Sequence, residues 1–339
     1  MLFRSIGTTV QVDNQAANRK GEYYWKTVSA DNATRPFLKS VTVTGNVGQN
    51  QLSQTVTPFL PKSTSAQPEQ LSYDLDGNLL SDGRWSYTWD GENRLVKIES
   101  LAIPADTENT QSIIDGLKRK VMFEYDANGR RTRITTFKWN SAGNGWQVDS
   151  DILCLYNGWR CVAELAASDK SLQRSYLWGS DLSGSSEGAG GVGGLLAFRS
   201  VTFGGHYCSY DGNGNIVALN SASGANIGAV TGVYEYGPFG EPIRVSGAAA
   251  SENPFRFSTK RVEPESGLVL YEYRAYSPSL GRWLSRDPIE EKGGENLYAV
   301  TRNDLLNLFD YLGLEWIVDR QGEARASAWI GCGDKDTWD

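Results

Sequence analysis

A short turn motif recurs along the chain and constrains its fold more than any other feature. In each copy, an aromatic residue is followed by Asp, then by residues rich in Gly and Asn, and then by an Arg or an apolar run. Gly and Asn tolerate the positive φ angles of tight turns, and the Asp can accept hydrogen bonds from backbone N–H groups of the turn. Each copy therefore predicts a β-hairpin. The copies begin at Tyr73-Asp74, Trp89-Asp90, Tyr125-Asp126 and Tyr210-Asp211.

The residues beside these turns alternate as they do in β-strands. Segments 85–89 and 121–125 place an aromatic or apolar residue at every second position, and period two indicates a sheet with two distinct faces. A single hairpin cannot bury its apolar face alone. We therefore expect an all-β chain in which stacked antiparallel hairpins form a long sheet that curls on itself. The alternative is an ordinary β-sandwich in which the Tyr-Asp pairs are coincidental.

Composition narrows the classes of function. Aromatic residues make up 11% of the 339 residues, with 37 Gly and only 2 Met, and this mixture favours strands and turns over helices. The net charge is −7 and Lys and Arg do not cluster, which argues against nucleic acid as a partner. Apolar runs such as 194–198 are far shorter than the roughly 20 residues of a membrane helix. The N-terminus shows no secretory signal, so we expect either another export route or a fragment.

The cysteines do not indicate a metal site. Cys154, Cys161, Cys208 and Cys332 are few for this length and show no zinc-type spacing. We expect buried thiols that pack as small apolar groups, with Cys332 the most exposed of the four. The sequence predicts no metal and no cofactor.

The C-terminal third carries a highly specific resemblance. The segments Gly267–Pro278, Gly281–Pro288 and Gly293–Tyr298 are similar, nearly word for word, to the core domain of the Rhs (rearrangement hot spot) family, whose repeats are built on Tyr-Asp pairs. The resemblance covers the chain from about Leu71 to Leu314. It implies a β-strand spiral that forms a shell around a toxic C-terminal polypeptide, with the core domain as its plug. It also implies a secreted or cell-surface location and a role in contact-dependent competition.

The organisation follows from the same observations. We predict a strand-rich segment at 1–60, a linker at 61–70, the repeat sheet at 71–252, the core domain at 253–314 and a short variable tail at 315–339. The linker lacks periodicity and is rich in Gln, Ser and Pro. The tail is too short to fold alone as a toxin domain.

Two aspartates in the core domain suggest chemistry. Asp287 and Asp310 resemble the paired signatures at which Rhs proteins cut their own chain, and the resemblance places the cut between Leu314 and Glu315. Two carboxyl groups that share one proton can hydrolyse a peptide bond, because one protonates the carbonyl while the other activates water. We expect Arg286 to hold the ionised partner or to stabilise the developing oxyanion.

The chain departs from the family pattern near these aspartates. Tyr311 and Leu305 stand where the family usually has Pro, and 289–291 lacks the usual Gly after the first motif. Loss of a rigid turn can slacken the geometry and slow cleavage about a hundredfold. The alternative is that both aspartates only cap neighbouring turns and a short helix expected over 303–309.

Two further patterns favour structural roles. The segment 188–193 fits the Gly-x-Gly-x-x-Gly pattern of dinucleotide-binding loops, but a strand-like run and no acidic partner follow it, so we expect a flexible loop. His206 is the only histidine and lies two residues before Cys208. The sequence shows no third group that would orient the imidazole ring, so we expect a buried histidine rather than the base of a Cys-His pair.

Three functions remain open. The first is a shell scaffold with autoproteolysis, whose partners would be its own C-terminal tail or toxin cargo, secretion-system components or further copies of the chain. The second is a carbohydrate- or protein-binding adhesion module, which exposed aromatic residues on one face would favour. The third is a protease acting on other substrates, which would need an accessible cleft at Asp287.

Overall fold

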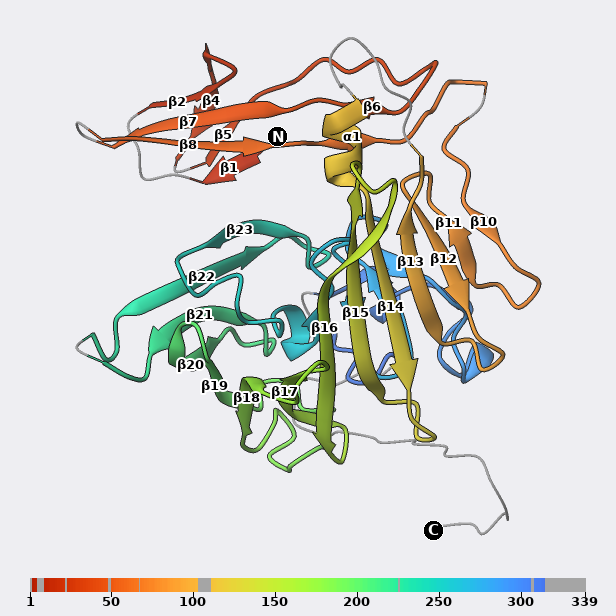
Figure 1. Cartoon of the computed structure of the whole chain (residues 1–339), viewed down its shortest axis with the longest axis vertical. Coiled ribbons are helices and arrows are strands. Elements are labelled where there is room, and N and C mark those ends of the chain that lie inside the picture. Colours follow the sequence, from red (N-terminus) through yellow and green to blue (C-terminus); the bar gives the residue numbers. More distant parts are fainter. Residues whose placement is uncertain are drawn as a thin grey trace.

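The computed structural model in Figure 1 describes residues 2–4, 9–21, 23–47, 50–66, 68–102, 111–224, 226–305 and 308–314. Fourteen strands form one open sheet, and each pairs antiparallel with the next strand along the chain. The predicted stack of hairpins is therefore confirmed, and the sandwich alternative is wrong. The strands are β10 (Ser72–Tyr73), β11 (Leu79–Ser81), β12 (Trp85–Trp89), β13 (Leu95–Ser100), β14 (Arg119–Tyr125), β15 (Arg131–Asn140), β16 (Gly145–Asn157), β17 (Arg160–Ala166), β18 (Leu172–Trp178), β19 (Leu195–Ser200), β20 (Gly204–Tyr210), β21 (Ile216–Ser221), β22 (Val230–Tyr236) and β23 (Pro242–Ser246).

Smaller sheets lie on both sides of this sheet in sequence. A four-stranded sheet near the C-terminus contains β24 (Arg261–Val262), β25 (Val269–Leu270), β26 (Ala275–Ser277) and β27 (Arg282–Trp283). The N-terminal strands cross the top of Figure 1. They are β1 (Leu2–Arg4), β2 (Thr9–Val12), β3 (Gln15–Ala16), β4 (Asn18–Lys20), β5 (Tyr23–Trp25), β6 (Phe37–Leu38), β7 (Val41–Val47), β8 (Asn50–Val56) and β9 (Phe59–Leu60).

Helix is scarce in the described residues. One α-helix, α1 (Gln111–Leu117), precedes β14, and short 3-10 turns cover Phe257–Thr259, Glu290–Lys292 and Thr301–Asn303. The helix expected over 303–309 is not found in the described part of that range, where only the end of a 3-10 turn is helical. Among the residues of known placement, no helix has the length and apolar character needed to cross a membrane.

Each Asp of the turn motif binds its own hairpin. In the turn after β14, one carboxylate oxygen of Asp126 accepts hydrogen bonds from the N–H groups of Asn128 (2.9 Å) and Arg130 (3.0 Å). The other accepts one from Nε of Arg130 (2.8 Å), and Gly129 supplies the positive φ of +78°. Because all these contacts lie within five residues, the turn motif specifies its geometry locally. Asp90 and Asp211 repeat both the paired backbone contacts and the side-chain contact.

From β12 onward, the aromatic residue before a turn ties its strand to the preceding strand. The hydroxyl of Tyr125 donates a hydrogen bond to the carbonyl of Leu95, the first residue of β13 (2.7 Å). The same contact occurs at the ends of six even-numbered strands, β12 to β22, and three of these strands lack the Asp that made the other copies visible in the sequence. The aromatic donors are Trp89, Tyr125, Tyr156, Trp178, Tyr210 and Tyr236.

One face of the sheet is buried and the other is exposed. Buried aromatic and aliphatic residues of successive strands form one core cluster with residues of the C-terminal segment, including Leu270 and Leu284. That segment lies behind the curved sheet in Figure 1 and bonds to it through backbone contacts, such as Leu79 N–H to the Leu284 carbonyl (2.8 Å). The opposite face exposes Leu177 (61%) and Tyr207 (54%). Most aromatic residues of the repeat sheet thus face inward, which is the arrangement that the shell hypothesis requires.

Candidate active site

The fold brings the two aspartates of the core segment onto one arginine. Asp287 follows β27, and Asp310 lies in irregular chain close to the last described residue. Nη2 of Arg274 contacts Oδ2 of Asp287 at 2.9 Å and Oδ2 of Asp310 at 3.3 Å. All three side chains are almost completely buried, with exposures of 1%, 6% and 1% in that order. The two carboxyl groups therefore share a water-poor environment and a single cation.

Arg274 is held rigidly by further contacts. It directly precedes β26, its guanidinium carbon lies 4.2 Å from the ring centre of the buried Trp283, and its Nε donates to the carbonyl of Gly313. A guanidinium stacked on an indole and bonded on several sides has little freedom to rotate. Arg274 therefore sets the positions of both carboxylates.

Asp310 fixes the chain that leads to the predicted scissile bond. Its Oδ1 accepts hydrogen bonds from the N–H groups of Leu312 (3.2 Å), Gly313 (2.6 Å) and Leu314 (3.1 Å). Gly313 has φ +80°, a conformation that L side chains rarely adopt. The carboxylate thus faces the cluster and also caps the turn that ends at Leu314. Capping of a turn is the role that the alternative without catalysis assigned to Asp310. Glu315 lies outside the described residues.

Burial and neighbouring charges act on Asp287 in opposite directions. Burial, as the largest effect, raises the pKa of Asp287 above its ordinary value, and the nearby Asp310 adds to the rise, while Arg274 opposes it. Gly293 lies so close to Asp287 that a Cβ at this position would be 2.6 Å from Oδ2 of Asp287, so the position requires glycine. The protonated form of Asp287 is therefore more favoured in this site than it is for an aspartic acid in free solution.

Arg286 lies apart from this cluster. Its side chain is exposed and lies against Gly77, where its Nε would be only 2.3 Å from an added Cβ. The ion pairs described for both aspartates go to Arg274 instead. The sequence did contain a signal for Arg274, because this arginine stands directly between the aromatic Tyr273 and Ala275-Tyr276, the apolar start of β26.

Tyr311 occupies the position of the missing proline and is anchored by packing. It is 3% exposed and forms a small buried cluster with Ala189 and Val192 of the glycine-rich loop. Gly190 approaches it so closely that a Cβ there would lie 2.4 Å from the Tyr311 carbonyl oxygen. The turn after Asp310 is therefore restrained by tertiary contacts where proline would restrain it locally.

An open cavity of about 1040 Å³ adjoins the cluster. Its lining includes Asp287 and Arg286 from the core segment, together with turn residues of successive hairpins such as Asn93 and Arg130. A protease that acts on other substrates needs an accessible cleft at Asp287. Because a cavity is present, that hypothesis stays a prediction.

The glycine-rich loop has no nucleotide-binding context. Turns of 188–193 lead into strand β19 rather than a helix. The carboxylate of Asp181 accepts hydrogen bonds from the N–H groups of Ala189 (2.7 Å) and Gly191 (3.1 Å). The expectation of a flexible loop is wrong in one respect, because this buried loop is fixed by hydrogen bonds and packs on the core segment.

His206 is a buried structural histidine. Its Nδ1 lies 2.9 Å from Oγ1 of Thr231 and its Nε2 lies 3.1 Å from the carbonyl oxygen of Phe203, while its ring stacks on Phe198. Burial lowers the pKa of His206 and raises that of the Cys208 thiol to about 12. An activated Cys-His pair needs the opposite shift on the thiol.

Comparisons with known proteins give distant but consistent relatives. No family model matches the chain. It is 26% identical over 282 residues to the tRNA3(Ser)-specific nuclease WapA of Bacillus spizizenii, covering 81% of the chain and 10% of that protein. It is 35% identical over 108 residues to toxin subunit YenC2 of Yersinia entomophaga, covering 29% of the chain and 11% of that protein. The chain thus spans about a tenth of the length of these relatives.

A solved structure shares the fold. The TcdB2-TccC3 crystal structure matches with a TM-score of 0.54 at 20% identity, over 89% of this chain and 14% of that chain. At this identity the likeness shows the fold alone. Together, the WapA and YenC2 alignments and this shared fold support, at the level of the broad family, the resemblance to Rhs proteins with Tyr-Asp repeats.

Proposed function

We propose that the chain is a segment of a secreted or surface-displayed shell of the Rhs type and that it cuts its own backbone between Leu314 and Glu315. The shell role is supported by a repeat sheet with an aromatic interior and by similarity to proteins named as a toxin subunit and a tRNA-specific nuclease. The partner would be the polypeptide that follows Leu314. Because fourteen strands form an open sheet, closing a shell would need further repeats or further copies of the chain.

The proposed organisation keeps the core domain at 253–314 as the plug and the catalytic part. The observation that carries the proposal is the buried cluster of Asp287, Asp310 and Arg274, in which Asp310 also binds the backbone of Leu312 to Leu314. A tie between one carboxylate and the residue before the scissile bond positions the reacting chain in advance.

Charge in the cluster favours one shared proton. With both carboxyl groups ionised, the single cation of Arg274 would leave one uncompensated buried negative charge, which is costly. Retaining one proton makes the cluster neutral, and the raised pKa of Asp287 makes this residue the proton carrier. Asp287 is then the general acid, and ionised Asp310 is the general base.

The proposed reaction is hydrolysis of one peptide bond. Asp310 removes a proton from water as the water oxygen bonds to the carbonyl carbon of Leu314, and Asp287 donates its proton to the carbonyl oxygen. The C–N bond then breaks as the nitrogen of Glu315 takes the proton held by Asp310, and one hydroxyl of the tetrahedral intermediate returns a proton to Asp287. Arg274 is the positioning residue for both carboxylates. Arg286 borders the same cavity as Asp287 and would stabilise, from the solvent side, the negative charge that develops on the carbonyl oxygen before the proton is fully transferred.

The test is the intact mass of the freshly purified chain. We expect the wild type to separate into 1–314 and 315–339, while Asp287→Asn and Asp310→Asn remain whole, because each amide removes one proton-transfer group with little change in shape. Asp169→Asn, at an exposed loop position, is the matched control and should cut like the wild type. A wild type that stays whole would contradict self-cleavage and leave only the scaffold role.

A further inference from the structure

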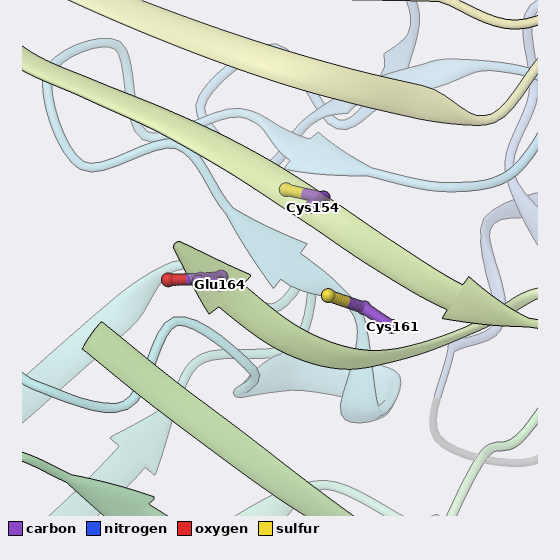
Figure 2. A group of neighbouring side chains, drawn as sticks. All are labelled: Cys154, Cys161 and Glu164. Carbon is purple, nitrogen blue, oxygen red and sulfur yellow. The ribbon is translucent and has the colours of Figure 1, made fainter. Parts of the chain in front are cut away.

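Two cysteines that look unrelated in the sequence lie together inside the sheet. Figure 2 shows Cys154 on β16 and Cys161 with Glu164 on the neighbouring β17. The two sulfurs and a carboxylate oxygen of Glu164 all lie within 4.8 Å of one another. In the register, Cys154 is opposite Glu164 and Cys161 is opposite Tyr156, with a bulge between, so both sulfurs lie on one face.

The surroundings of Glu164 oppose a metal ion at this cluster. One oxygen of Glu164 is bound by Arg261 and by the hydroxyl of Tyr176 (2.8 Å), and the other by Arg174 (2.9 Å). Both oxygens are therefore already used, and two guanidinium groups repel a cation at this point. Without Glu164 as a ligand, two thiols remain, which is fewer than a zinc site needs.

The same surroundings favour a negative charge shared by the sulfurs. A hydrogen bond from the Cys161 thiol lowers the pKa of Cys154, and the charge of Arg261 contributes to this shift against the opposing effect of burial. The hydrogen bond between the two thiols also raises the pKa of Cys161. These shifts place the thiolate on Cys154 and the proton on Cys161, whose thiol also donates to the carbonyl of Ala163 at 3.6 Å.

A cavity leads to the sulfur of Cys161, which lies within 4.8 Å of the Cys154 sulfur. Cys161 lines a cavity of about 230 Å³, which is also bordered by Tyr156, Lys260 and Arg261. This volume admits a molecule as small as hydrogen peroxide, and the cationic border stabilises a thiolate. Cys208 differs, because burial without a cationic partner raises its pKa.

We propose that Cys154 and Cys161 form a redox-active dithiol that a peroxide converts into a disulfide across β16 and β17. The attacking thiolate takes one oxygen of hydrogen peroxide, the O–O bond breaks and the other oxygen leaves as hydroxide, which becomes water. The second thiolate then attacks the sulfenic acid sulfur, a second water leaves and the S–S bond forms. Two thiols and one peroxide thus give one disulfide and two waters.

A trypsin digest tests the bond directly, because Arg160 separates the two cysteines. Cleavage after Lys138, Arg160 and Lys170 places Cys154 in peptide 139–160 and Cys161 in peptide 161–170. After peroxide treatment of the native chain and alkylation of remaining thiols, we expect these peptides to be linked and to separate on reduction. The linked chain should also unfold at a higher temperature than the reduced chain.

Variants identify the partners. Cys208→Ser should still give the linked peptides, whereas Cys154→Ser should not link and should carry Cys161 as a free or over-oxidised thiol. Two alkylated peptides after peroxide, or a link from Cys154 to Cys208, would overturn the proposal. Protection of both thiols from alkylation by zinc ions alone would also overturn it and would assign the cluster to a metal.

Discussion

Asp287 is buried beside one cation and one anion, so the net charge of the buried cluster depends on whether one carboxyl group is protonated. Its pKa is raised, so the protonated form of this group is favoured by the folded state. The stability that this group contributes is therefore fully present below its ordinary pKa of 3.8 and is lost as the pH rises through the raised value.

The same shift predicts the pH dependence of self-cleavage. If Asp287 is the general acid, the cleavage rate should fall as the pH rises through its raised pKa, because the proton is lost. The measurement is the half-life of the intact wild type by mass spectrometry from about pH 4 to about pH 8. A rate that rises steadily over this range would contradict the assignment of Asp287 as the acid.

Another single residue shows how the chain tolerates its departures from the family pattern. Glu290 has φ +56°, in the left-handed region that favours glycine, at the point where the usual Gly is missing. A non-glycine residue in this conformation costs about 1 kcal/mol. The backbone turn after Asp287 is thus kept in spite of the side chain, because the surrounding core segment fixes it.

At the scale of elements, the sheet is held by a repeated contact between each even-numbered strand from β12 to β22 and the strand before it. The aromatic donor lies at the end of its strand and bonds to the start of the preceding strand. In addition, an arginine of one turn lies over the aromatic ring of the next repeat, as Arg94 does over Tyr125 at 4.9 Å. Each hairpin is thereby aligned with its neighbour through side chains as well as through the backbone ladder.

Removal of one aromatic hydroxyl tests this contact. Tyr125→Phe should lower the free energy of unfolding by about 1–2 kcal/mol, because the carbonyl of Leu95 loses its donor in a buried position. Tyr207→Phe is the matched control on the exposed face and should change it by less than about 0.5 kcal/mol. Denaturant titration measures both, and equal values for the two variants would contradict a structural role for the contact.

At the scale of the whole molecule, buried ion pairs join the repeat sheet to the core segment. Glu164 of β17 is fully buried and binds Arg261 of β24. Burial disfavours its charge, but Arg261 and Arg174 overcome this effect and lower the pKa of Glu164. The stability that this group contributes is present above its ordinary pKa of 4.5 and is lost as the pH falls through the lowered value.

Neutralising Glu164 should therefore weaken the whole chain. Glu164→Gln leaves the largely buried guanidinium of Arg261 without its counterion and leaves Arg174 with Glu252 alone, and we expect a loss of about 3–5 kcal/mol of unfolding free energy at neutral pH. Glu124→Gln, which removes a pair between Glu124 and Arg133 that is 63% and 37% exposed, should cost less than about 1 kcal/mol. Similar losses for both variants, followed by denaturant unfolding, would show that the buried network does not couple sheet and core.

The amino-acid order alone determined the local features of this chain. Alternation of apolar residues and the Asp, Gly and Asn chemistry of the turns act over a few residues, and they predicted strands, hairpins and an extended antiparallel sheet. The same reasoning missed the hairpins after Tyr156, Trp178 and Tyr236, because those turns lack the Asp. The pairing of Asp287 with Asp310 was expected only from the family resemblance.

Tertiary structure decided which side chains meet across the sheet and the core segment. Arg274 rather than Arg286 binds the aspartates, Tyr311 is anchored by a distant loop, and Cys154 and Cys161 meet through a bulged strand register. These contacts depend on register and on packing between segments far apart in the chain. Spacing in sequence carries no information about either, since a shift of one residue in register turns a side chain to the opposite face.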